Sequence, residues 1–200
     1  MLRVGLTGGI ACGKTVVRKL LADRGAFTID ADEIAHRLLA AETELARQIT
    51  EAFGTDVLAA DGSVDRKKLG AIVFSDSSAR LKLNELVHPR VIAEERRLLD
   101  AAERKGVEVA VVDAALMVEA GTYRDYHRLV VVHCPRALQV ERLMARGLSG
   151  DEAAGRIDSQ LPIEEKLRYA DYLVDTSGNL KDTERQVGEV WKKLHREASQ

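Results

Sequence analysis

The residues from Gly8 to Thr15, GGIACGKT, place the strongest constraint on how this chain folds. They match the pattern G-x-x-x-x-G-K-[ST] and lie between a short apolar run and a segment with helical spacing. In such a loop the glycines let backbone N–H groups point at phosphate oxygens, the lysine reaches the outer phosphates, and the hydroxyl group can bind Mg²⁺. The segment therefore predicts a nucleotide-binding loop between a strand and a helix.

Five short apolar runs recur along the chain, and segments with helical spacing separate them. Residues 107–113 and 128–134 are rich in β-branched side chains, which is typical of central parallel strands. Strands that alternate with helices predict an α/β fold of the P-loop NTPase type: a five-stranded parallel sheet flanked by helices, with ligands beyond the carboxyl ends of the strands. The expected strands are residues 2–6, 26–30, 107–113, 128–134 and 172–175.

Residues 31–105 are mostly helical in pattern, and turn-forming sequences interrupt them. The interruptions are FGTD, AADGS and the His88-Pro89 pair, where we expect a helix to end because proline disfavours a continuing helix. A buried His88 could also hydrogen-bond the acceptor substrate. Further along, Ser149 and Glu152 have the spacing of a helix capping box.

Composition excludes several classes of protein. A formal net charge of −2 argues against nonspecific nucleic-acid binding, which usually needs an excess of basic residues. No apolar run approaches the ~20 residues of a membrane span, and the N-terminus lacks the layout of a signal peptide. Two cysteines are too few for a disulfide scaffold or a cysteine-based metal site. We expect a cytoplasmic single domain without a membrane, nucleic-acid or obligate protein partner.

Three aspartates follow predicted strands near the loop. If the second strand extends to Asp32, Asp30 and Asp32 point the same way, and one could accept a hydroxyl proton while the other orients Mg²⁺. The alternative is that Asp32 caps the next helix. Asp113 ends the third strand, where it is either a ligand of Mg²⁺-bound water or a solvated side chain. The metal is thus expected at Thr15, with Asp30 or Asp113 through water.

Arg142, Arg146 and Arg156 bracket a helix-loop-helix pattern. Acidic residues are interleaved with them, so a solvated charged surface is one interpretation. The other is a lid that closes over ATP and brings guanidinium groups to the transferring phosphoryl group. The nucleotide-binding loop favours the lid.

Cys12 lies inside the loop, where phosphate binding requires only its backbone N–H. We interpret its side chain as a spectator that points away from the nucleotide. The N-terminus of the following helix is expected to lower the pKa of the thiol. Cys134 ends the fourth predicted strand as a small core residue, and its distance from Cys12 is left open.

Taken together, these segments closely resemble the dephospho-CoA kinases, P-loop kinases that phosphorylate the ribose 3′-hydroxyl of dephospho-CoA. The resemblance spans nearly the whole chain and includes GLTGGIACGKT, IDADEIAHRLL, NELVHPRV, DAALMVEAG and SQLPIEEKLRYADYLVDTSG. The IDAD and HP motifs distinguish this family from adenylate, guanylate and shikimate kinases. The resemblance implies a nucleoside-monophosphate-kinase-like fold with a core at about 1–30, 106–135 and 171–200, a helical CoA-substrate region at about 31–105, and a lid at about 142–170.

The resemblance also implies roles for the candidate residues. Asp32 would be the general base, and Lys14, Arg142 and Arg146 would stabilise charge during transfer from MgATP. The segment Thr176 to Asn179 would lie near the ATP adenine. The residues expected to bind ligands are Asp32, His88 and Arg156 for dephospho-CoA, and Gly9, Ala11, Cys12, Gly13, Lys14, Thr15, Val16, Arg142, Gly178 and Asn179 for ATP.

The chain departs from the family pattern at three places. Ala11-Cys12 replaces a frequent Gly-Ser, Ala115 replaces a usual proline, and His36 stands where arginine is common, with Arg37 adjacent. The first two change no group that the mechanism requires, and the third leaves open which cation meets the substrate's phosphates. Two other functions remain as alternatives: another small-molecule or nucleoside phosphate kinase, and a noncatalytic nucleotide-binding module.

Overall fold

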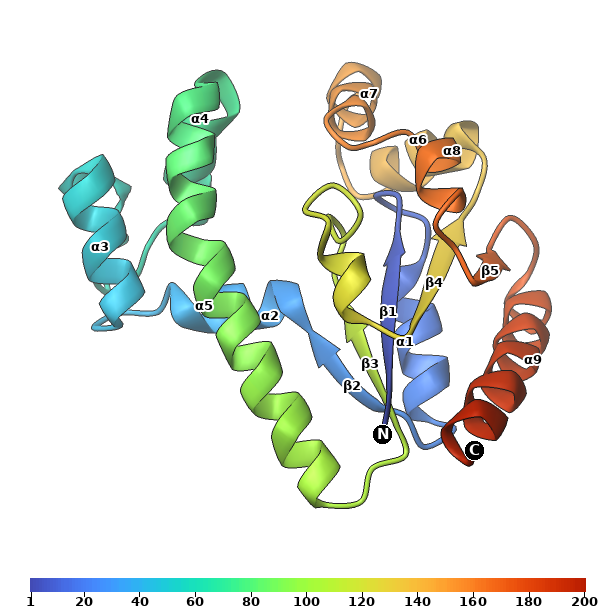
Figure 1. The fold of residues 1–200 in the computed structure, drawn as a ribbon. Coiled ribbons are helices and arrows are strands. Elements are labelled where there is room, and N and C mark those ends of the chain that lie inside the picture. The colour runs from blue at the N-terminus through green and yellow to red at the C-terminus, as the bar shows by residue number, and fades with distance from the viewer. The chain divides into compact units, whose positions relative to one another are not determined.

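A five-stranded parallel sheet forms the centre of the larger part of the molecule (Figure 1). The computed structural model describes the backbone of residues 1–200 and all side chains except those of Phe74, Ser75 and Ser77. The strand order is β2-β3-β1-β4-β5, so β1 lies in the middle with its loop at the centre of the carboxyl edge. The strands are β1 (Leu2–Gly8), β2 (Phe27–Asp30), β3 (Val109–Asp113), β4 (Arg128–His133) and β5 (Tyr172–Asp175), which confirms the expected fold class.

Helices α1 (Lys14–Ala22) and α9 (Leu180–Ala198) contact each other and the sheet. Their apolar sides and the β-branched strand residues form one core, which includes the fully buried Val17, Val130 and Leu194. Burying each such side chain stabilises the fold by about 1.5–3 kcal/mol. This core fixes the start of α1, and therefore the loop before it, against the strands.

The chain divides into two compact units. Unit 1 comprises residues 1–30 and 101–200, and unit 2 comprises residues 31–100. Unit 2 has its own apolar core, with Leu45, Ile49 and Val57 fully or almost fully buried. Its elements are α2 (Ala31–Leu38), α3 (Glu44–Phe53), η1 (Thr55–Val57), α4 (Arg66–Ser75) and most of α5 (Ser77–Arg104).

The expected helix end at His88-Pro89 is wrong, because α5 continues through both residues. Proline removes one backbone donor and crowds the carbonyl group of the preceding turn. The carbonyl group that loses its backbone donor is that of Glu85, four residues before Pro89, and the Arg90 guanidinium donates a hydrogen bond to the neighbouring Leu86 carbonyl oxygen at 2.7 Å. Because α5 has 28 residues, helical turns remain on both sides of Pro89, and the helix tolerates the loss of one backbone hydrogen bond.

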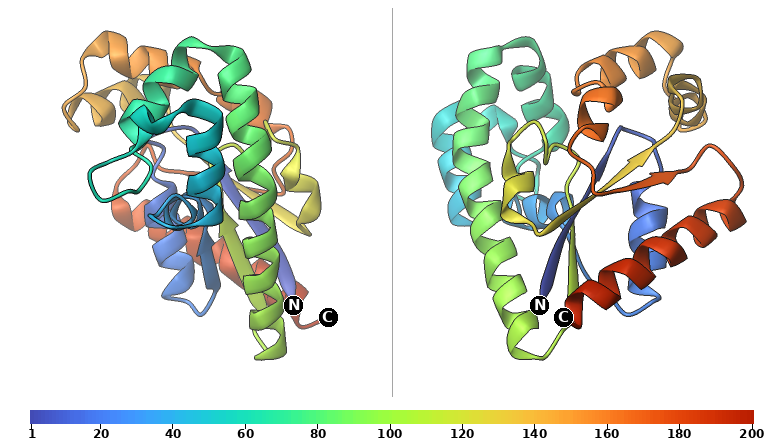
Figure 2. Two further views of the ribbon diagram at one scale, coloured as in Figure 1. Left: turned by 90° about the vertical axis from the view of Figure 1, so that its left-hand side faces the viewer. Right: turned by 45° about the vertical axis from the view of Figure 1, so that its right-hand side comes forward.

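Three short helices follow β4 in unit 1: α6 (Arg136–Met144), α7 (Gly150–Asp158) and α8 (Ile163–Leu167). Figures 1 and 2 show them beyond the carboxyl ends of the strands. The capping box is confirmed, since Ser149 and Glu152 exchange both hydrogen bonds at the start of α7. A one-turn helix, η2 (Thr122–Asp125), precedes β4. Among the described residues, no helix combines the length and apolar character needed to cross a membrane.

Candidate active site

The loop between β1 and α1 has a backbone that only certain residues permit. Gly13, at the start of α1, has a φ of 84°, in the left-handed region that glycine adopts without strain. Gly8 packs against β4 so closely that an added Cβ atom would lie 2.2 Å from the Val132 carbonyl oxygen. Ala11 also adopts a positive φ, 58°, which is uncommon for a residue with a side chain. The loop is therefore a specific wrapped conformation rather than an ordinary turn.

Residues distant in the sequence hold this loop from outside. The Arg142 guanidinium donates hydrogen bonds to the carbonyl oxygens of Ala11 at 3.1 Å and Thr176 at 2.7 Å. The Thr176 hydroxyl donates to the Cys12 carbonyl oxygen at 2.8 Å. Because the N–H of the next residue points opposite to a peptide carbonyl, this bond turns the Gly13 amide away from Thr176.

Lys14 and three further charged side chains form a network at the carboxyl edge of the sheet. Lys14 Nζ lies 3.1 Å from Asp113 Oδ1, and Arg18 Nε lies 3.3 Å from Asp113 Oδ2. Arg18 also pairs with Asp30 at 2.8 Å, and Asp30 and Asp113 occupy paired positions on β2 and β3. Burial raises the pKa of Asp113, while the positive charges of Lys14 and Arg18 act in the opposite direction. The network gathers two carboxylates and two cations around the start of α1.

Asp32 does not extend the second strand. β2 ends at Asp30, and α2 begins at Ala31, so Asp32 lies in the first turn of a helix in unit 2. The expectation that one strand aligns the Asp30 and Asp32 carboxylates is therefore wrong, and Asp32 is also not the residue that precedes the helix. The cause is local: the chain turns directly from strand into helix after Asp30. His88 also belongs to unit 2, within α5.

A cavity of about 270 Å³ lies on the outer side of the loop. Arg146 lines it together with Arg142, and Asn179 caps the helix that borders it by accepting a hydrogen bond from the Asp182 N–H at 3.1 Å. The lining thus includes guanidinium groups, loop backbone and the segment after β5. The lining residues are Ala11, Gly13, Val16, Arg142, Arg146, Thr176, Gly178, Leu180 and Thr183.

The segment after α7 is tied to the loop by amide side chains. The Gln160 side-chain oxygen accepts a hydrogen bond from the Ile10 N–H at 2.8 Å, and Gln139 donates to the Ile10 carbonyl oxygen at 2.7 Å. The fully buried Lys166 side chain lies 2.8 Å from Glu119 and donates to the Ala115 carbonyl oxygen at 2.8 Å. Arg156, in contrast, is exposed in the last turn of α7.

Sequence reasoning did not single out Arg18, and it did not predict the contact that Thr176 makes with the loop. Arg18 lies four residues after Lys14, on the same side of α1, so helical spacing could have indicated it. Thr176 directly follows β5, as Asp113 ends β3, but its bond to the Cys12 carbonyl depends on a contact between distant segments. The resemblance implied that Thr176 lies near ATP, but no local pattern indicated this bond.

The pKa expectation for Cys12 is wrong. Its thiol is fully buried, as expected for a side chain that points away from the nucleotide. The thiol of Cys134 as hydrogen-bond partner and burial raise the pKa of Cys12 instead of lowering it. Cys134 is also buried, and the two Sγ atoms lie 3.5 Å apart.

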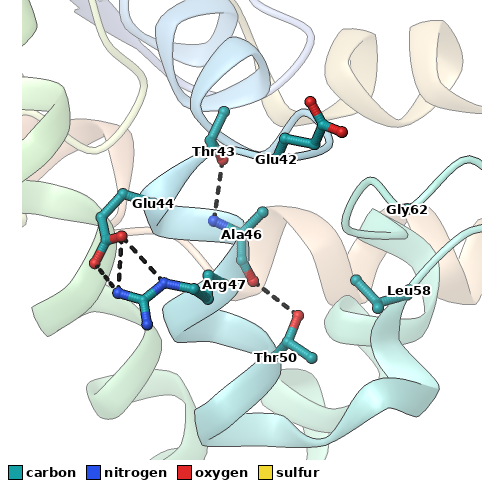
Figure 3. Close-up of a pocket in the computed structure, with 8 residues that line it drawn as sticks. All are labelled: Glu42, Thr43, Glu44, Ala46, Arg47, Thr50, Leu58 and Gly62. Carbon is teal, nitrogen blue, oxygen red and sulfur yellow. Dashed lines mark hydrogen bonds and ion pairs between the residues drawn. The ribbon is translucent and has the colours of Figure 1, made fainter.

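Unit 2 contains a separate cavity of about 270 Å³ around the start of α3 (Figure 3). The Thr43 hydroxyl accepts a hydrogen bond from the Ala46 N–H at 3.1 Å, and Arg47 binds both oxygens of Glu44. These polar groups therefore satisfy one another. The lining residues are Glu42, Thr43, Glu44, Ala46, Arg47, Thr50, Leu58 and Gly62.

Comparison with known proteins connects this geometry to a family. The model of the dephospho-CoA kinase family matches residues 2–182. The chain belongs to the dephospho-CoA kinase family. A dephospho-CoA kinase of Geobacter sulfurreducens is 44% identical over 193 residues, covering 95% of this chain and 97% of that protein. One from Aquifex aeolicus is 36% identical over 197 residues, covering 98% of this chain and all of that protein.

Solved structures agree with this membership. A Thermus thermophilus protein superposes with a TM-score of 0.81 at 31% identity, covering 96% of this chain and 97% of that one. The dephospho-CoA kinase of Campylobacter jejuni gives a TM-score of 0.73 at 29% identity, with 98% of both chains covered. A shikimate kinase of Acinetobacter baumannii, at 17% identity and a TM-score of 0.52, shares the fold alone. The expected family and the expected ATP-dependent kinase class are confirmed.

Proposed function

We propose that this kinase transfers the γ-phosphoryl group of MgATP to the ribose 3′-hydroxyl of dephospho-CoA, which gives coenzyme A and ADP. The observation that carries the proposal is the family match over residues 2–182, which includes the loop with Lys14 and the strand-end carboxylates. Phosphoryl transfer needs positioning and spread positive charge more than covalent chemistry, and these residues supply both.

ATP would bind through the loop and its outer cavity. The backbone of Gly9 and residues 11–16 would receive the phosphates, with Lys14 at the outer phosphates. The cavity of about 270 Å³ would receive the nucleoside, near Gly178 and Asn179. Arg146 lines this cavity and would add positive charge to the transferring group.

Arg142 would act differently from Arg146. Its guanidinium already donates to the Ala11 and Thr176 carbonyl oxygens, so it supports the shape of the loop while contributing charge. A residue that holds carbonyl groups outward keeps amide groups available for phosphate oxygens.

Mg²⁺ fits the donor set at the start of α1. Hard cations prefer hydroxyl and carboxylate oxygens, and Thr15, Asp30 and Asp113 supply these atoms at one edge of the sheet. The ion would neutralise phosphate charge and orient the transferring group. Arg18 pairs with both carboxylates and would keep them in place.

Dephospho-CoA would bind in the region of residues 31–105, with residues 142–170 as the lid. Asp32, in the first turn of α2, would accept the proton of the ribose hydroxyl as general base. His88 and Arg156 would contact the acceptor. A location in the cytoplasm and action without an obligate protein partner complete the proposal.

An acceptor panel tests the reaction directly. ADP release is measured with dephospho-CoA, with nucleoside monophosphates, with shikimate and without an acceptor. The product formed from dephospho-CoA is checked by mass spectrometry for one added phosphate. We expect rapid ADP release with dephospho-CoA alone. Rapid turnover of another acceptor would support a different small-molecule kinase, and ATP binding without acceptor-dependent ADP release would support a noncatalytic module.

A further inference from the structure

The two cysteines of the chain meet beneath the nucleotide-binding loop. Cys12 belongs to the loop and Cys134 follows β4, yet their Sγ atoms lie 3.5 Å apart. Both thiols are free, with exposed fractions of 0% and 3%. Sulfur atoms at this distance need a movement of only about 1.5 Å to reach the ~2.05 Å of a disulfide bond.

A further cavity in unit 1 borders one of the two cysteines. It has a volume of about 250 Å³ and lies between the loop and the segment after α7, where Gly9, Cys134, Gln139 and Gln160 line it. Cys12 does not contribute to this lining within the described side chains. A small oxidant that enters the cavity therefore meets Cys134 first.

The electrostatic surroundings also distinguish the two thiols. The hydrogen bond with Cys12 lowers the pKa of Cys134, and the positive charge of Arg142, whose Nη1 lies 3.7 Å from Cys134 Sγ, acts in the same direction. The pKa of Cys12 is raised. Because the thiolate is the nucleophile, Cys134 is the sulfur that attacks an oxidant.

We propose that Cys12 and Cys134 are a modification site, at which hydrogen peroxide forms an intramolecular disulfide that inactivates the loop. The Cys134 thiolate attacks one peroxide oxygen, the O–O bond breaks, and the departing hydroxide takes a proton to become water, leaving a sulfenic acid on Cys134. The Cys12 sulfur then attacks Cys134 Sγ, the S–O bond breaks, and the Cys12 proton leaves with the hydroxide as a second water. Two thiols lose two electrons in total, and peroxide gains them.

The disulfide bond would displace Cys12, which two hydrogen bonds hold in place within the loop. The Cys12 N–H donates to the Gly9 carbonyl oxygen at 3.2 Å, and the Cys12 carbonyl oxygen accepts from Thr176 at 2.8 Å. Drawing Cys12 toward Cys134 strains both contacts and the positive φ of Ala11. Loss of activity therefore rests on the proposed phosphate-binding role of the loop, whereas the disulfide rests on geometry alone.

Peptide mapping tests the disulfide without reference to activity. The wild-type protein is treated with excess hydrogen peroxide, alkylated, and digested with trypsin under nonreducing conditions. Cleavage after Arg3, Lys14, Arg128 and Arg136 releases residues 4–14 and 129–136, which contain one cysteine each. We expect these two peptides to be joined by a bond that dithiothreitol breaks. Sulfinic or sulfonic acids, or disulfides only between two chains, would overturn the proposal.

Kinase activity of the same samples tests the consequence. Oxidised wild-type protein should lose at least tenfold in kcat/KM with dephospho-CoA and regain it with dithiothreitol. Cys134→Ala, whose circular dichroism and melting temperature confirm folding, should retain activity after the same treatment and give no joined peptide. A joined peptide with unchanged activity would overturn the inactivation. An inactive reduced enzyme would instead count against the proposed function, so the two failures are distinguishable.

Discussion

The two units each contain a cavity of about 270 Å³, but they hold their polar groups in different ways. In unit 1, Arg142 reaches a carbonyl group 131 positions away, and Thr176 reaches one 164 positions away. In unit 2, the hydrogen bonds drawn at the cavity in Figure 3 span three or four positions, and Thr43 also donates to the Leu38 carbonyl oxygen five positions away. The first arrangement depends on the tertiary fold, whereas the second joins residues that are close in the sequence.

This difference indicates that the unit 1 cavity beside the loop is the one that binds a ligand. Hydrogen bonds between residues three or four positions apart form on any suitable helix and contribute little. Bonds from the end of β5, through Thr176, and from α6, through Arg142, onto one loop exist only when the sheet is assembled, and they fix backbone groups of the loop. We therefore expect substitutions around the loop to change catalysis strongly, and substitutions around the unit 2 cavity to change little.

Among the substitutions around the loop and around the unit 2 cavity, Lys14→Ala should have the largest effect. It removes the charge proposed to stabilise the transferring phosphoryl group, so kcat/KM should fall by about 10²–10³-fold. Steady-state kinetics with dephospho-CoA and MgATP measures the loss. Lys19→Ala, on an exposed position of the same helix, is the control and should change kcat/KM by less than about twofold. Equal effects of the two variants would contradict the role of Lys14.

Arg142→Ala and Arg146→Ala should separate loop support from direct charge stabilisation. Arg142→Ala leaves the Ala11 and Thr176 carbonyl groups without their donor, so the unfolding free energy should fall by about 1–3 kcal/mol and the KM for ATP should rise. Arg146→Ala should lower kcat with an unchanged unfolding free energy. Urea denaturation and kinetics measure both. If the two variants behave alike, the distinction between these arginines is wrong.

Arg18→Ala should have a smaller effect, mainly on stability. It removes one of the two cations that pair with the buried carboxylate of Asp113, whose side chain is 6% exposed. The unfolding free energy should fall by about 1–2 kcal/mol, less than for a fully unpaired buried charge, because Lys14 remains. Urea denaturation checks this value, and an unchanged midpoint would show that Arg18 does not support Asp113.

Arg47→Ala should have the smallest effect. Its ion pair with Glu44 is exposed at the unit 2 cavity, and exposed pairs of this kind contribute little to stability. We expect kcat/KM within about twofold of the wild type and an unchanged melting temperature. A large rise in the KM for dephospho-CoA would contradict the difference between the two cavities, because it would show that the unit 2 cavity is part of the acceptor site.

Local patterns predicted much of the fold. The strands at residues 109–113 and 128–133 follow directly from buried β-branched runs, and Ser149 marks the start of α7 because its capping box needs only four residues. The nucleotide-binding loop was also predictable, because the spacing of its glycines, lysine and threonine is typical of one loop conformation.

Long-range contacts were not predictable in the same way. The Arg142 and Thr176 bonds and the approach of Cys134 to Cys12 exist only once β1, β4 and β5 pair in register. The proline at position 89 misled the prediction because it costs one backbone hydrogen bond, which a helix of 28 residues can lose and still continue. Asp32 misled it because α2 begins at Ala31, directly after β2 ends at Asp30, and the spacing of the two aspartates does not show this boundary.

The central claim is transfer of one phosphoryl group to the ribose 3′-hydroxyl with Asp32 as base. Phosphorus-31 NMR of the reaction with dephospho-CoA and MgATP measures it, with Asp32→Asn compared against Glu33→Gln and ATP affinity measured by calorimetry. We expect a 3′-phosphate monoester signal from the wild type and Glu33→Gln, and formation about 10²–10⁴-fold slower in Asp32→Asn with nearly unchanged ATP affinity. A phosphate at another position, or full turnover in Asp32→Asn, would contradict the claim.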